Sequence, residues 1–149
     1  MSVSGIYRFA YQNRPDKFDF TSKENQQQVS DAYQYVHSEL GRIKQLADSI
    51  NSRMVVISIP LRYQMVLDLD EVGDIRYLDN LLSKSCDEMG LEFISLLDTL
   101  RVASQIEECY FPMDGHLNSI GNKVVGYFLG NWLMTKEWFN SENNKSRVL

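Results

Sequence analysis

The sequence has 149 residues, of which 44% are hydrophobic and 23% charged, and its formal net charge is −5. This composition suits one domain spanning residues 1–149 and excludes a disordered tail or a coiled coil. Nucleic-acid binding is not expected, because it needs a clustered basic face. No apolar run reaches the roughly 18 residues that a membrane span requires.

The first part of the chain predicts one helix and one strand after an irregular, aromatic segment at residues 1–20. Thr21–Glu24 has the spacing of a capping box, which is typical of a helix start. Apolar residues follow at intervals of three and four, as on one helical face: Val29, Ala32, Tyr33, Val36, Leu40, Ile43, Ala47 and Ile50. The β-branched run Met54–Ile59 then predicts a strand buried on both faces, and Pro60 ends it.

The second part of the chain predicts the remaining elements. A helix is expected over about 74–89 with Gly90 as its stop, then a strand over Leu91–Leu97 and a short helix within 98–108. A loop at 111–116, a last helix over about 119–139 and a polar tail at 141–149 complete the chain. This alternation predicts the α/β class, with a parallel sheet flanked by helices. Two strands are too few for an independent sheet, so strands upstream of this sequence are expected.

The loop before the last helix carries the residues most suited to chemistry. Asp114 and His116 are two residues apart, in a turn that Gly115 allows. At this spacing the carboxylate can hold the imidazole through Nδ1 while Nε2 faces a cleft, as in the acid–base pair of a serine hydrolase. In a parallel sheet the loop that follows a strand lies at the carboxyl edge, where ligands bind.

The sequence of this loop resembles the last conserved block of the SGNH (GDSL-like) hydrolase superfamily. D-G-H-L-N-S-I-G, residues 114–121, is similar to the D-x-H-x-N-x-x-G form of alginate-O-acetyltransferase-like members. The run from Met54 to Pro60 resembles the family's penultimate strand. The resemblance covers roughly residues 40–134 and implies a flavodoxin-like parallel sheet. The resemblance also implies that Asp114 is the acid and His116 the base, and that Asn118 and Gly121 lie at the start of the last helix.

The sequence departs from that family upstream of the loop. A G-D-S-like turn carrying the nucleophilic serine does not occur in these 149 residues. Gly5 and Asn13 are the only upstream candidates for the oxyanion-hole residues, and neither has the right surroundings. The resemblance therefore implies the C-terminal portion of such a domain, with its first three strands outside this sequence.

Two functions remain open at this point. The first is the C-terminal part of a serine esterase or O-acyltransferase acting on acyl esters, with acetyl expected, of a carbohydrate or small molecule. That chemistry needs no metal or cofactor. The alternative is a non-catalytic, self-associating interaction module in which the Asp/His loop is incidental. Both predict a homo-oligomer, because a missing upstream neighbour leaves an open strand edge.

Four other kinds of residue have a predicted role, and for some of them an alternative interpretation is open. Arg62, just past Pro60, and Asn118 are the candidate substrate-binding residues, and an ordinary solvent-exposed arginine is the alternative for Arg62. His37 is expected on a helix surface. Cys86 and Cys109 predict either a disulfide or two half-buried free thiols.

Two further features are expected to be structural. The acidic run 68–74 lacks the spacing of a calcium loop and is expected to be solvated. Trp132 and Trp138 predict core or partner packing, with a carbohydrate platform at Trp138 as the alternative.

Overall fold

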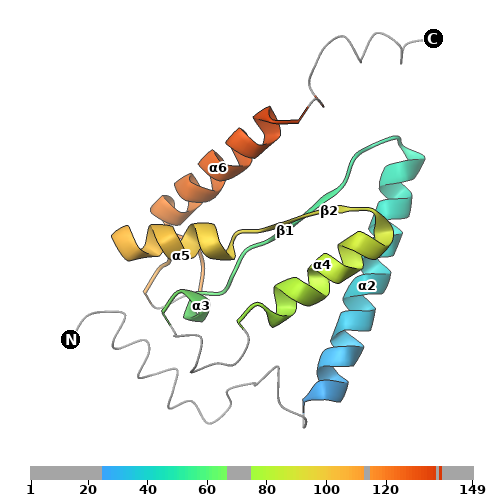
Figure 1. Cartoon of the computed structure of the whole chain (residues 1–149), viewed down its shortest axis with the longest axis horizontal. Coiled ribbons are helices and arrows are strands. Elements are labelled where there is room, and N and C mark those ends of the chain that lie inside the picture. Colours follow the sequence, from blue (N-terminus) through green and yellow to red (C-terminus); the bar gives the residue numbers. More distant parts are fainter. Residues whose placement is uncertain (1–24, 67–74, 113–114, 137, 139–149) are drawn as a thin grey trace.

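The computed structural model describes residues 25–66, 75–112, 115–136 and 138 (Figure 1). In this part of the chain, helices flank a two-stranded parallel sheet made of β1 (Val55–Ser58) and β2 (Glu92–Ser95). The expectations of an α/β fold and of parallel pairing are confirmed, since the two strands run in the same direction with α4 (Tyr77–Met89) between them in sequence.

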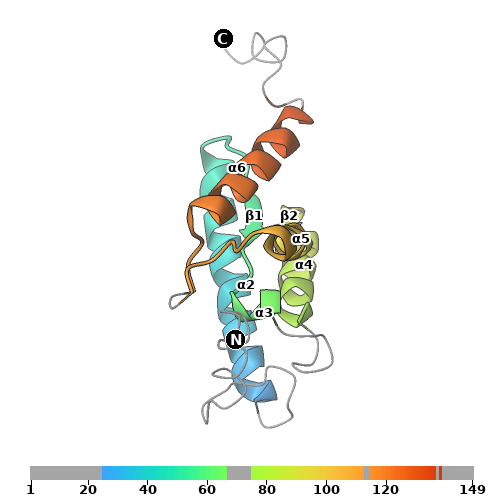
Figure 2. The same ribbon diagram turned by 90° about the vertical axis from the view of Figure 1, so that its left-hand side faces the viewer.

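The helix before β1 forms as the three/four spacing predicts. It is α2 (Gln26–Ser49), and it packs against α4, which lies next to it in both views (Figures 1 and 2). Of its predicted apolar face, Val29 is buried, whereas Ile43 and Ile50 are exposed. The capping-box residues Thr21–Glu24 lie outside the described residues, as does the aromatic segment 1–20. Within the described ranges, no helix combines the length and apolar character needed to cross a membrane.

The stop signal predicted at Gly90 is confirmed. Gly90 has φ +65°, a left-handed conformation that glycine adopts without a steric penalty, and it ends α4. The Leu91 N–H then donates to the Cys86 carbonyl at 2.8 Å, which satisfies one of the last helical carbonyls and directs the chain into β2.

The register of the two strands assigns their side chains to two faces. Ser58 pairs with Ser95, and both hydroxyls donate to the carboxylate of Asp79 in the first turn of α4. Ile57 pairs with Ile94 and therefore lies on the opposite face, because successive residues of a strand alternate. Figure 1 shows α6 (Ser119–Met134) on the other side of the strands from α4.

The core lies on the α6 side of the sheet, close to β2. After β2 the chain forms α5 (Leu97–Ile106), which packs against α6. The fully buried centre of this core contains residues that are at most 1% exposed: Leu96, Leu100, Cys109 and Tyr110. Partly buried apolar residues of α6 surround it, including Val124, Val125, Phe128, Leu129 and Trp132.

The expectation that β1 is buried on both faces is wrong for this structure. Ile57 is 39% exposed, and Ile59 and Leu61, which follow at two-residue intervals, are 51% and 50% exposed. The physical reason is that α5 and α6 cover the β2 side of this face, so Ile94 is buried while its neighbour Ile57 is not. In the described part of the chain β1 pairs only with β2.

The end of the last helix and one short helix also differ from expectation. The last helix ends at Met134 rather than near residue 139, with Thr135 as its C-cap. The short helix α3 (Tyr63–Val66) follows Pro60 and was not predicted, because four residues carry no detectable periodicity. The acidic run 68–74 and the polar tail 141–149 lie outside the described residues.

Candidate functional site

The loop that carries His116 is closed at its base by backbone contacts. Tyr110 and Leu117 form an antiparallel bridge, and the Phe111 N–H donates to the His116 carbonyl at 3.0 Å. These contacts hold Tyr110 and Phe111 beside Leu117 and His116, so both ends of the loop are fixed to each other. The Tyr110 hydroxyl donates to the Pro60 carbonyl at 2.5 Å, so the loop begins beside the carboxyl end of β1.

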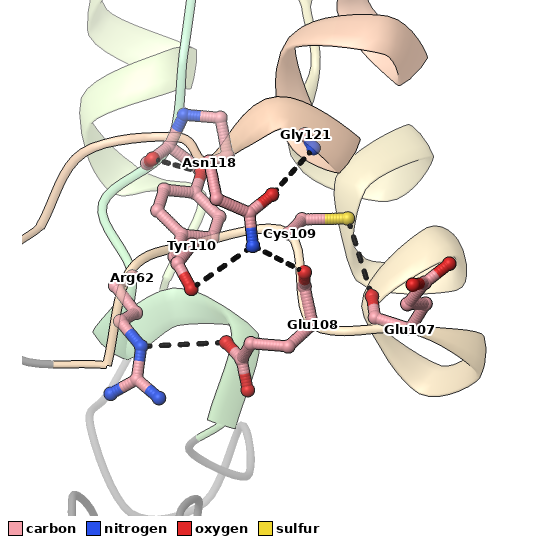
Figure 3. Close-up of polar contacts among 8 residues, drawn as sticks. Arg62, Glu107, Glu108, Cys109, Tyr110, Asn118 and Gly121 are labelled. Carbon is pink, nitrogen blue, oxygen red and sulfur yellow. Dashed lines mark hydrogen bonds and ion pairs between the residues drawn. The ribbon is translucent and has the colours of Figure 1, made fainter.

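Asn118 joins this loop to α6 (Figure 3). Its side-chain oxygen accepts from the N–H groups of Ile120 at 2.9 Å and Gly121 at 3.0 Å, as an N-cap does. Its amide nitrogen donates to the carbonyls of Glu108 at 2.7 Å and Tyr110 at 3.4 Å. One side chain thus fixes the helix start and the strand-like segment that enters the loop.

Gly121 is required by a close approach of two backbone segments. A Cβ atom at this position would lie 2.2 Å from the Cys109 carbonyl oxygen and 2.8 Å from a methyl group of Leu117. The same carbonyl accepts from the Asn118 N–H at 3.0 Å, so it is not free to move away. Close packing therefore explains why a glycine occupies the last position of the D-x-H-x-N-x-x-G sequence in this chain.

Of the predicted acid–base pair, only His116 lies within the described residues. His116 is exposed at the surface of the loop. Asp114 lies outside the described residues, so a hydrogen bond between its carboxylate and the His116 imidazole stays a prediction. What the structure places is the His116 backbone, through its bond to Phe111 and its position two residues before the α6 cap.

Arg62 is buried, and the reading of an ordinary solvent-exposed arginine is wrong. Its side chain has no exposed surface, and Nε lies 3.4 Å from a carboxylate oxygen of Glu108 (Figure 3). A guanidinium withdrawn from water needs an opposite charge nearby, and Glu108 supplies one. The pair connects the segment after β1 to the segment before the His116 loop.

Substrate contact by Arg62 or Asn118 stays a prediction. Asn118 uses both atoms of its amide within the protein, and Arg62 exposes none of its side chain. The geometry therefore favours a structural contribution from both residues. Sequence reasoning missed Glu108 and Tyr110, because nothing in their spacing indicates that they meet Arg62 and Pro60, about fifty residues away in sequence.

His37 is not the plain surface histidine that the sequence suggested. Its Nδ1 lies 3.0 Å from the Ser85 hydroxyl and 3.8 Å from a Glu88 carboxylate oxygen, at the contact of α2 and α4. This cluster is not a serine–histidine–acid triad, because a triad places the serine and the acid on different ring nitrogens. Ser85 is also completely buried, away from any substrate.

The two cysteines and two tryptophans have structural surroundings. Cys86 and Cys109 are both buried free thiols, and burial raises the pKa of the Cys86 thiol, helped by the negative charge of Asp87. Trp132 and Trp138 meet edge to face with ring centroids 5.4 Å apart, and Lys136 lies 4.5 Å above the Trp132 ring. Packing of this kind favours the structural reading of the tryptophans.

Burial also governs the Tyr110 hydroxyl. Loss of hydration raises the pKa of Tyr110 above its usual range, and the neighbouring Cys109 adds to the effect. No group of three or more His, Cys, Asp or Glu side chains suitable for a metal ion occurs among the described residues. Comparison of the chain with protein-family models, with curated proteins and with solved structures gave no match.

Proposed function

We propose that this chain is the C-terminal part of an SGNH-type serine esterase or O-acyltransferase. The substrate would be an acyl ester, with acetyl expected, of a carbohydrate or small molecule. The observation that carries the proposal is the placement of the His116 loop. Tyr110 holds its start against the Pro60 carbonyl beside the carboxyl end of β1, and the Asn118-capped helix follows. The carboxyl edge is where parallel α/β sheets bind ligands.

In this proposal His116 is the general base. A serine outside these 149 residues attacks the acyl carbonyl, and the His116 imidazole accepts the serine proton as the new C–O bond forms. The tetrahedral intermediate then expels the alcohol, which takes that proton from the imidazolium and leaves an acyl-enzyme. Water or an acceptor hydroxyl removes the acyl group in the second half-reaction. Asp114 orients the imidazole throughout.

A non-catalytic, self-associating interaction module is the second candidate. The specific observation in its favour is the exposed apolar row of Ile57, Ile59 and Leu61, next to a strand that pairs only with β2 among the described residues. An unpaired strand edge is a template for pairing with another chain. Self-association is also compatible with the enzyme, so activity rather than oligomeric state decides between the two candidates.

The first test uses the purified 149-residue chain in an acetyl-ester hydrolysis assay. Wild type, His116→Ala and the matched control His37→Gln are compared with a protein-free blank. We expect no turnover above the blank in any of the three, because the nucleophile is missing. Turnover that His116→Ala loses and His37→Gln keeps would show that a serine of this chain serves as the nucleophile.

The second test uses the gene. We expect its reading frame to extend upstream through a strand and a G-D-S-like turn. The full-length protein should then label with a fluorophosphonate and hydrolyse acetyl esters. His116→Ala should lower kcat by about 10³-fold or more, and His37→Gln should leave it unchanged. A reading frame that starts at Met1, or a full-length protein that neither labels nor turns over, would favour the interaction module.

A further inference from the structure

Two links hold the His116 loop against the segment that follows β1. One is the ion pair between Arg62 and Glu108, with its atoms 3.4 Å apart. The other is the hydrogen bond from the Tyr110 hydroxyl to the Pro60 carbonyl at 2.5 Å. The second is shorter and better shielded from water, because Tyr110 is 1% exposed and Pro60 is buried, whereas Glu108 is partly exposed.

We propose that Tyr110 is a positioning residue, and that its hydroxyl latches the loop that carries His116 to the carboxyl end of β1. The catalytic consequence of this latch rests on the proposed function, whereas the latch itself does not. Tyr110 would act through the loop backbone and would not touch the substrate. Its ring also belongs to the buried core cluster, so the latch joins the loop to that core.

The neighbouring contacts explain why this hydroxyl controls the loop. Tyr110 pairs with Leu117 across the loop base, and the Phe111 N–H bonds to the His116 carbonyl one position further out. A shift of Tyr110 away from Pro60 would therefore move both ends of the loop together. On the strand side, the Leu61 N–H donates to the Gln64 side chain at 2.7 Å, which fixes the chain directly after the acceptor carbonyl.

The latch is expected to persist over a wide pH range. Burial raises the pKa of Tyr110 above its usual range, so the hydroxyl keeps its proton where a free tyrosine would begin to lose it. A protonated hydroxyl remains a donor to Pro60, and the loop is held in place under alkaline conditions.

Hydrogen exchange on the 149-residue chain tests the latch without any assay of activity. Tyr110→Phe removes only the hydroxyl and keeps the ring. We expect the Phe111 amide, which closes the loop, to exchange about tenfold faster, since a buried carbonyl loses its partner. Amides of α2 should keep their wild-type rates. The matched control is Tyr127→Phe, at a tyrosine of α6 that is 77% exposed, and it should change neither.

Two outcomes would overturn the latch. The first is an unchanged exchange rate at Phe111 in Tyr110→Phe. The second is equal acceleration at every amide, including those of α2, because that would mean the hydroxyl supports global stability and not the loop. Thermal unfolding followed by circular dichroism, run on the same samples, separates a local effect from a global one.

Kinetics of the full-length protein test the positioning role. We expect Tyr110→Phe to lower kcat about tenfold with little change in KM, because a displaced base costs the chemical step more than binding. If wild type is inactive while the exchange result holds, the proposed function fails and the latch stands. If wild type is active and Tyr110→Phe has the same kcat, the positioning role is wrong although the function survives.

Discussion

The two sides of the small sheet contrast in how well their apolar residues are covered. Directly after β2, Leu96 and Leu100 are completely buried in the core cluster that residues of α6 surround. Ile57 of β1 and Ile59, just after this strand, are equally apolar but 39% and 51% exposed. This difference in exposed fraction shows that residue type alone does not decide whether a side chain is buried. The β2 side is covered by α5 and α6, whereas the described residues leave Ile57 on the β1 side exposed.

The largest expected effect comes from truncating a leucine on the covered side. Leu100→Ala should lower the free energy of unfolding by about 3 kcal/mol, because it removes buried methyl groups and leaves a cavity. Ile59→Ala, on the uncovered side, should change it by less than about 0.5 kcal/mol. Urea unfolding of both variants measures the contrast. Equal losses would mean that the segment just after β1 is as well packed as the core around Leu100.

A somewhat smaller loss is expected where α6 approaches the loop. Gly121→Ala should destabilise the chain by about 2 kcal/mol, since its Cβ would overlap the Cys109 carbonyl. Gly130→Ala is the matched control on the same helix, because nothing lies within 4 Å of its Cβ. It should stabilise by about 0.5 kcal/mol through a better helix propensity. Thermal unfolding of the two variants should give shifts of opposite sign.

Removing the helix cap should have an intermediate effect. Asn118→Ala loses the bonds to Ile120 and Gly121 and those to the carbonyls that precede the loop, so we expect a loss of about 1.5 kcal/mol. Asn131→Ala, at an exposed position of α6, should be neutral. The measurement is again urea unfolding. A neutral Asn118→Ala would mean that water replaces the cap without cost.

The last prediction concerns the oligomeric state of the chain and involves the smallest expected change in stability. The isolated chain should sediment as a dimer or larger species at micromolar concentration, because β1 has one paired edge among the described residues and an exposed apolar row beside it. Ile59→Lys should shift the chain towards monomer. Ile106→Lys, at an isoleucine of α5 that is 85% exposed, should not. A clean wild-type monomer would show that this chain closes its own core.

Much of the local structure could be read from the sequence, because its signals are local. The three/four spacing gave α2, the β-branched run gave β1, and Gly90 marked the end of α4. Asn118 was expected at the start of the last helix, and it is the N-cap there. Each signal acts within a few residues, through helical geometry, strand propensity or a backbone conformation that glycine tolerates.

The sequence by itself determined most of the helices and strands, except the short α3, together with the parallel pairing and the position of the loop before the last helix. Only the tertiary structure decided that Arg62 is buried against Glu108, that Tyr110 reaches Pro60, and that β1 is exposed on the α6 side. These contacts join residues about fifty positions apart in the chain. Their physical cause is the packing of whole elements against one another, which sets the distance between two side chains and has no local signal in the sequence.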